Sequence, residues 1–225
     1  MSGFPAGNKL ITSEILYYIL IAFFTACITI ALLNWYLSMD DISNFTSLQD
    51  GKVYGIRDIP DIENKKKAVN QLSSISKKID YLTEYMYKNG LPNQQTATRL
   101  ISRWSTCKLR ETSSNDSSVA FTVNKGSEMR LCIRKNDNQF EDENTSIFVV
   151  LHELAHIMSV TYGHNQEFRD NFAYLVRLAS QMNVYTPQNF ARDPQSYCNT
   201  VINTTPCSDG SCVGTLSPNA YPSGE

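Results

Sequence analysis

The three histidines of the chain all lie within the thirteen residues from His152 to His164, and this spacing constrains the fold more than any other feature. His152 and His156 are four residues apart, so a helix would present both from one face. Two imidazole nitrogens on successive turns can then bind one cation, while Glu153 lies beside a metal-bound water. Zinc lowers the pKa of such a water to about 7, and a carboxylate can carry its proton to a leaving amine. The motif therefore predicts a helix with two zinc ligands and Glu153 as a general base.

The third histidine requires the chain to turn back after this helix. A helix continued from His156 to His164 would rise about 12 Å, which is too far for both to hold one ion through bonds near 2 Å. Gly163 can reverse the chain because glycine adopts left-handed conformations readily. We therefore predict a Zn²⁺ site of His152, His156 and His164, with the fourth position open for water. Glu167 is the alternative third ligand, but imidazole suits zinc and Gly163 directly precedes His164.

The residues that lead into the motif predict a buried helix. Positions 147–151 form an apolar run, Ile-Phe-Val-Val-Leu, directly before His152. Asn144, Thr145 and Ser146 precede this run and are candidate helix caps.

A second strong feature is the uncharged run at residues 15–37, which has 23 positions. This length is enough to cross a bilayer core of about 30 Å. Tyr17, Tyr18, Trp35 and Tyr36 fall near its ends, where aromatic belts of membrane helices lie. The alternatives are a cleaved signal peptide or a buried core helix, but the run is long for a signal peptide and has no basic region before it. We predict a single-pass transmembrane helix in contact with the lipid bilayer, and the side of the membrane stays open.

These two features divide the chain. Residues 1–14 form a polar N-terminus before the transmembrane helix at 15–37. Residues 38–60 read as a juxtamembrane connector, and 61–206 as the catalytic domain. Residues 207–225 are rich in Gly, Ser and Pro and predict a mobile tail.

Charge and cysteine content exclude some classes of function. The net charge of −2 offers no electrostatic case for nucleic-acid binding. The six cysteines form no C-x-x-C pair, so no second zinc site is expected. Five of them lie outside the apolar run, and this odd number leaves at least one thiol without an internal partner. The pairing state of Cys198, Cys207 and Cys212 stays open.

Helical periodicity predicts three further helices. The first spans about 61–88, with apolar residues at alternating spacings of four and three that predict packing onto the domain itself. The second spans about 92–104, and the third about 165–182. An extended segment at 183–200 would then wrap the domain.

Two strands are predicted before the motif, at 118–124 and 128–134, joined by a turn at Lys125 and Gly126. A strand laid beside the motif helix could pair its free edge with a substrate backbone. Two purely structural strands fit the sequence equally well.

The stretch His152-Glu-Leu-Ala-His156, followed by Gly163-His164 and Phe168, resembles the WLM and SprT-like zincin metallopeptidases. The wider stretch from 122 to 198 is similar to membrane-anchored WLM-type proteins of large DNA viruses, in virion or host membranes. The resemblance covers roughly residues 118–200 and implies an α+β fold, a small zincin-like metallopeptidase domain with an HExxH helix, a short sheet and flanking helices. It implies zinc on the three histidines, Glu153 as the base, and a protein or peptide substrate. Some soluble relatives cleave proteins crosslinked to DNA, but this chain has an apolar anchor and no evident DNA-binding module.

Two other hypotheses stay open. One is a structural protein of a virion or membrane with a zinc-bound but inactive domain, although a structural site needs no base such as Glu153. The other is a membrane-tethered binding module, which the clustering of all three histidines argues against. Tyr162 could stabilise an oxyanion or could belong to the core.

Overall fold

The structure, a computed structural model, describes residues 7–37 and 41–206. The chain separates into two compact units, residues 1–40 and 41–225. The predicted tail at 207–225 lies outside the described residues.

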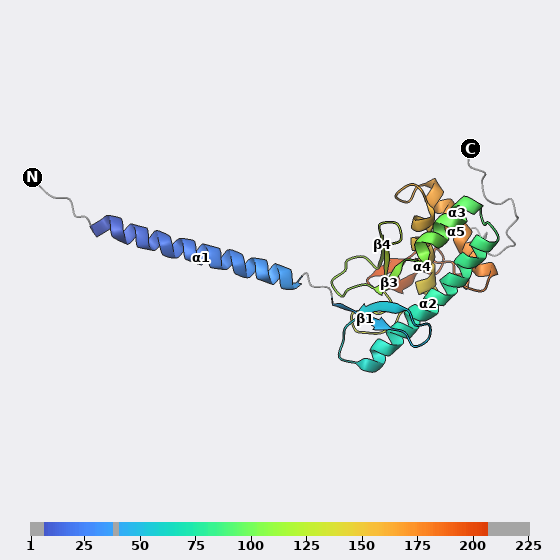
Figure 1. Cartoon of the computed structure of the whole chain (residues 1–225), viewed down its shortest axis with the longest axis horizontal. Coiled ribbons are helices and arrows are strands. Elements are labelled where there is room, and N and C mark those ends of the chain that lie inside the picture. The colour runs from blue at the N-terminus through green and yellow to red at the C-terminus, as the bar shows by residue number, and fades with distance from the viewer. Residues whose placement is uncertain (1–6, 38–40, 207–225) are drawn as a thin grey trace, which may run out of the picture. The chain divides into compact units, whose positions relative to one another are not determined.

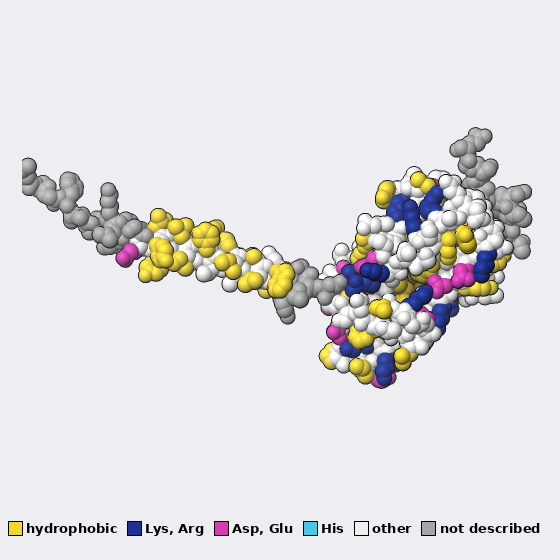
Figure 2. Space-filling view, in the orientation of Figure 1, with side chains coloured by type: hydrophobic (Ala, Val, Ile, Leu, Met, Phe, Trp, Pro, Cys, Tyr) yellow, Lys and Arg dark blue, Asp and Glu magenta, His cyan; other side chains and the backbone are white. Residues whose placement is uncertain are grey.

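The N-terminal unit holds one helix, α1 (Gly7–Leu37). From Glu14 to Trp35 this helix is long and apolar enough to cross a membrane. Figure 2 shows hydrophobic side chains along this span. The helix begins at Gly7, eight residues before the predicted span.

The second unit is built on a mixed five-stranded sheet, in the order β1-β2-β3-β5-β4 (Figure 1). The strands are β1 (Ile42–Thr46), β2 (Val53–Arg57), β3 (Lys108–Glu111), β4 (Ala120–Val123) and β5 (Glu128–Leu131). The outer pairs, β1 with β2 and β4 with β5, are antiparallel, while β2, β3 and β5 run parallel. The predicted hairpin before the motif is therefore confirmed, and its first strand, β4, forms a free edge of the sheet.

The predicted connector at 38–60 is wrong for most of its length, because β1 and β2 lie within it and belong to the sheet. Tyr54 and Ile56 are buried on β2, and Gly55 between them lies where a Cβ atom would overlap the side chain of Arg110. A strand buried on both faces has no alternating polar pattern to mark it. The folded domain therefore begins about twenty residues earlier than predicted.

Within residues 41–206, four helices pack with the sheet: α2 (Ile62–Lys88), α3 (Gln94–Trp104), α4 (Glu143–Met158) and α5 (Gln166–Gln181). The apolar face predicted for α2 is fully buried and packs onto the domain, as expected: Ala68, Leu72, Ile75, Ile79, Leu82 and Met86. Helix α4 is capped by Asp142, whose side chain accepts from the Thr145 amide. The predicted cap Asn144 instead bonds the backbone of Thr186 through its amide group.

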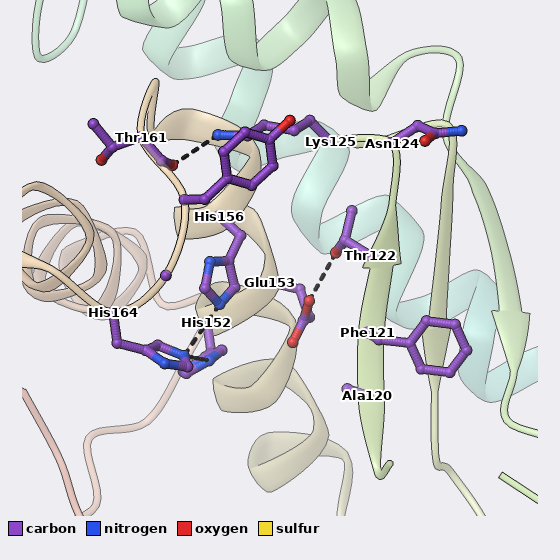
Figure 3. A pocket seen from close by; sticks show the side chains of 12 residues that line it. Ala120, Phe121, Thr122, Asn124, Lys125, His152, Glu153, His156, Thr161 and His164 are labelled. Atoms are coloured by element: carbon purple, nitrogen blue, oxygen red, sulfur yellow. Dashed lines mark hydrogen bonds between the residues drawn. The ribbon is translucent and has the colours of Figure 1, made fainter. Parts of the chain in front are cut away.

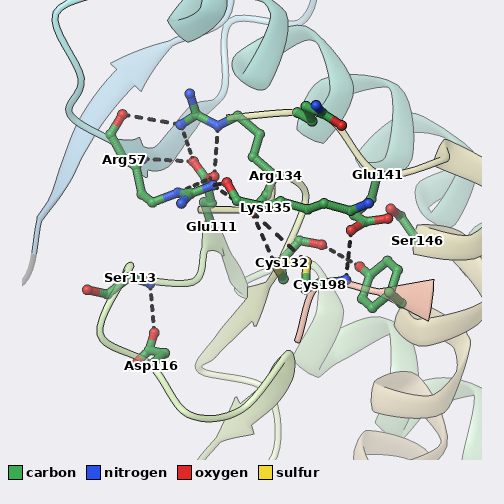
Figure 4. The surroundings of a disulfide bond; sticks show 12 residues. Arg57, Glu111, Ser113, Asp116, Cys132, Arg134, Lys135, Glu141, Ser146 and Cys198 are labelled. Carbon is green, nitrogen blue, oxygen red and sulfur yellow. Dashed lines mark hydrogen bonds and ion pairs between the residues drawn. A yellow bond between two sulfur atoms is a disulfide. The ribbon is translucent and has the colours of Figure 1, made fainter. Parts of the chain in front are cut away.

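The segment after α5 crosses the domain and is fixed at its end by a disulfide between Cys132 and Cys198 (Figure 4). Strands β6 (Gln195–Tyr197) and β7 (Thr200–Ile202) form a small hairpin around Cys198. The Tyr197 hydroxyl donates to the carbonyl of Cys132, and the Cys198 amide donates to Glu141 at 2.7 Å. The pairing answers the question that the cysteine count left open for Cys198.

A buried ion cluster lies beside this disulfide (Figure 4). Glu111 accepts from the Nε atoms of Arg57 and Arg134, each at 2.8 Å, and from the Arg57 amide. All three side chains are at most 5% exposed. The cluster joins β2 and β3 to the segment that follows β5.

Candidate metal centre

The three histidines converge on one point at the end of α4 (Figure 3). His152 and His156 lie on successive turns of that helix, and His164 comes from the loop before α5. The Nε2 atom of His164 is 3.0 Å from that of His152 and 3.2 Å from that of His156. Among the described residues, these three form the cluster whose ligand atoms could hold a metal ion.

The spacing of the nitrogens fits zinc. A tetrahedral ion with Zn–N bonds near 2.0–2.1 Å separates its ligand nitrogens by about 3.3 Å. The observed 3.0 and 3.2 Å are close to that value. Three imidazoles are also a donor set that zinc favours, and three protein ligands leave a position for water.

The electrostatics keep two of these imidazoles neutral. Burial, followed by the neighbouring His156 and His164, lowers the pKa of His152 to about 4. Burial, His164 and Lys125 lower the pKa of His156 to about 4. Both rings are therefore uncharged at pH 7, which is the form that binds a metal.

An aromatic layer supports the three rings from α5. Phe168 stacks on His156 with ring centroids 4.3 Å apart and contacts His152 and His164 edge-on. Phe172 adds a second edge-on contact to His152. These contacts orient the rings, so the aromatic residue four positions after His164 packs against the site.

Glu153 is buried beside the histidines, with 6% of its surface exposed. Thr122 of β4 donates a hydrogen bond to its Oε2 atom at 2.8 Å. Burial raises the pKa of Glu153, and this hydrogen bond opposes the rise. A carboxylate with a raised pKa accepts a proton more readily, which suits general-base work. Sequence reasoning missed Thr122, because only the placement of β4 beside α4 gives it this role.

The chain turns back in the loop between α4 and α5, as the spacing of His156 and His164 requires. The helix ends at Met158, and Gly163 has a φ of 81°, in the left-handed region that favours glycine. Glu167, the alternative ligand, faces this loop instead of the three histidines. It accepts from the amides of Val160 at 2.7 Å and Thr161 at 3.0 Å. Its role is therefore to hold the loop that carries His164.

A cleft of about 490 Å³ opens over the histidines. One wall is the edge strand β4 with the turn that follows it, and the other is the return loop. Tyr162 lies on that loop and is 83% exposed, so it is not a core residue. Its ring lies over the ammonium of Lys125, with the nitrogen 4.1 Å from the ring centroid.

Comparison with known proteins identifies the family of this chain. The WLM domain matches residues 96–206. Uncharacterized protein R325 of Acanthamoeba polyphaga mimivirus is 30% identical over 155 residues, which are 67% of this chain and 77% of that protein. Uncharacterized protein 136R of Invertebrate iridescent virus 6 is 39% identical over 69 residues, which are 29% of this chain and 38% of that protein. Among solved structures, Wss1 from Saccharomyces cerevisiae is 24% identical, with 53% of this chain and 84% of that chain covered at a TM-score of 0.40. The chain therefore belongs to the WLM domain family, among the WLM-type proteins of large DNA viruses.

Proposed function

We propose that this protein is a membrane-anchored zinc metallopeptidase that hydrolyses peptide bonds in protein or peptide substrates. The observation that carries the proposal is the convergence of His152, His156 and His164 beside the buried carboxylate of Glu153. Zinc bound by these histidines would supply a polarised carbonyl and a water of lowered pKa.

Glu153 has the position and the environment of the general base. Thr122 holds the Oε2 atom, and we assign proton transfer to Oε1. The carboxylate takes a proton as the water attacks the scissile carbonyl, and it returns that proton to the leaving amine. The base is thereby restored, and the peptide bond is replaced by a carboxylic acid and an amine, which exchange a proton to become a carboxylate and an ammonium group.

The edge strand β4 is the proposed guide for substrate. It pairs with β5 on one side and lines the cleft with the other. An extended substrate could add to this edge through main-chain hydrogen bonds, which hold a backbone without demanding one particular sequence. A substrate aligned in this way would cross the cleft above the three histidines.

We propose that α1 is the membrane anchor. Its span from Glu14 to Trp35 has the length and composition of a membrane helix. A tether of this kind would confine the peptidase to substrates at the surface of a virion or host membrane.

The test uses the full chain in detergent, in wild-type form and as Glu153→Gln. Metal content and cleavage of a broad peptide library are measured on both proteins. We expect about one zinc per chain in each, with cleavage only by the wild type, because glutamine cannot accept the proton. Glu84→Gln is the matched control, since Glu84 forms an exposed pair with Lys88.

Two other outcomes are informative. Zinc in both proteins with no cleavage by either would favour the structural, inactive zinc domain. A folded wild-type chain that binds no zinc would rule out the metallopeptidase.

A further inference from the structure

The side chain of Lys125 is bound to three consecutive backbone carbonyls of the return loop. Its Nζ atom donates to the carbonyl oxygens of Ser159 and Val160, each at 2.9 Å. It also donates to the carbonyl oxygen of Thr161 at 2.8 Å (Figure 3). An ammonium group has three protons, so all of them are used here. This lysine therefore holds three successive peptide groups in one arrangement.

The turn that carries Lys125 is itself tightly specified. Asn124, Lys125 and Gly126 all have positive φ values, of 46°, 52° and 116°. A Cβ atom on Gly126 would lie 3.2 Å from Arg103 and 3.4 Å from Ile157, so the turn packs closely on the end of α4. The β4–β5 turn is thus seated against the helix that carries two of the histidines.

Two arginines from α3 extend the same pattern toward the helix. Arg103 donates to the carbonyl of Ile157 and Arg99 to that of Met158, each at 2.8 Å. With Lys125, cationic side chains bind five successive carbonyls, from 157 to 161. Cations at a helix C-terminus stabilise its unpaired carbonyls and its dipole.

Lys125 differs from the two arginines in what it holds. Ile157 and Met158 belong to α4, whereas Val160 and Thr161 lie beyond its end. Glu167 accepts from the amides of Val160 and Thr161, and Lys125 donates to the carbonyls of the same two residues. A positive side chain therefore binds the carbonyls of these two residues, and a negative side chain binds their amides. This stretch of backbone ends three residues before His164.

We propose that Lys125 is a positioning residue for the metal site, which sets the place of His164 by fixing residues 159–161. The inference rests on the proposed zinc site. The proposal also gives β4 a second role. This strand lines the cleft, and the turn at its end carries Lys125, which fixes the loop before His164. Outer-shell partners of metal ligands typically change metal affinity by about 10–100-fold when they are removed.

The first test is zinc affinity of the full chain in detergent, measured by competition with a chromophoric chelator. Lys125→Met keeps the length of the stem and removes the donor. We expect zinc to bind about 10–100-fold more weakly. Lys88→Met is the matched control, because it removes an exposed lysine that pairs with Glu84, and its affinity should equal that of the wild type. Unchanged affinity in Lys125→Met would overturn the proposal.

A double-mutant cycle separates positioning from a general loss of structure. In a His164→Ala background the third ligand is already gone, so Lys125→Met should weaken zinc by no more than about twofold further. An equal loss in both backgrounds would mean that Lys125 acts on the whole fold and not through His164.

Hydrogen exchange of the metal-free chain gives a readout that needs no zinc. We expect the amides of Val160 and Thr161, which donate to Glu167, to exchange at least about tenfold faster in Lys125→Met, since the loop loses its carbonyl partner. Unchanged exchange would also overturn the proposal. If the wild-type chain binds no zinc, the proposed function fails, while this exchange measurement still decides whether Lys125 holds the loop.

Discussion

Thr122 and Glu153 are joined by a 2.8 Å hydrogen bond that links the edge strand β4 to the helix α4 (Figure 3). The strand that forms one wall of the cleft therefore also orients the carboxylate proposed as the base. A substrate that pairs with β4 would press on the same strand that holds Glu153. In the proposed mechanism, one element, β4, would therefore both align the substrate and orient the base.

Thr122→Val should reduce kcat/KM by about tenfold, because it removes an outer-shell partner while keeping the side-chain shape. The lost hydrogen bond is one that lowers the pKa of Glu153, so that pKa rises in the variant. The base must be ionised to act, and the acid limb of the pH–rate profile should therefore move to higher pH. Thr122→Ser keeps the donor and should retain the wild-type profile. An unshifted limb in Thr122→Val would contradict this role.

Gly163→Ala should weaken zinc binding by about fivefold. Nothing lies within 4 Å of the added Cβ atom, so the effect comes from the positive φ of 81° alone. A non-glycine residue in this region costs about 1 kcal/mol. Gly51→Ala is the control, since Gly51 has a φ of 71° and equally open surroundings in the β1–β2 turn. It should lower stability without changing zinc affinity, and equal affinity losses in the two variants would refute the prediction.

Glu111→Gln should destabilise the domain by about 3 kcal/mol, as measured by chemical unfolding. The substitution leaves the buried guanidinium groups of Arg57 and Arg134 without their counter-charge. Breaking one partner of a buried ion cluster is costly because the remaining charges stay desolvated. Glu84→Gln at the exposed pair with Lys88 should cost less than about 1 kcal/mol. Similar losses for both variants would show that the buried cluster has no special weight.

The pH dependence of stability should include a contribution from Asp50. Burial raises its pKa, but hydrogen bonds from Tyr54, Ser73 and the Lys52 amide outweigh this and hold the pKa at about 2. The folded value lies below the ordinary 3.8, so the stabilisation is present above about pH 4 and is lost as the pH falls toward 2. Asp50→Asn should be less stable than wild type by about 1–2 kcal/mol at pH 7, after allowance for solvent screening. The difference should shrink at pH 2, and a difference independent of pH would exclude this account.

Local periodicity explains which parts of this fold are readable from sequence. The spacing of His152 and His156, and the buried face of α2, depend only on residues one helical turn apart. The return loop also followed from local geometry, since no continuous helix could bring His164 back to His156.

Features that depend on distant residues were not readable in this way. Strand β2 can be identified only when its neighbours β1 and β3 are known. Cys132 forms a disulfide with Cys198, which lies 66 residues further along the chain. Thr122 and Lys125 look like ordinary polar residues of a hairpin. Their roles arise because the sheet places that hairpin against the end of α4, which no local pattern encodes.

The disulfide between Cys132 and Cys198 makes the site part of a covalent ring. The bridge lies before α4 at one end and after α5 at the other, so the ring contains all three histidines and Glu153. A single cut in the exposed loop at 160–165 would open the backbone without parting the two pieces. Such a nicked chain would migrate as one species without reductant and as two species with it. When the disulfide is formed, His156 and His164 are therefore linked covalently in two ways, through the backbone of the loop and through the disulfide.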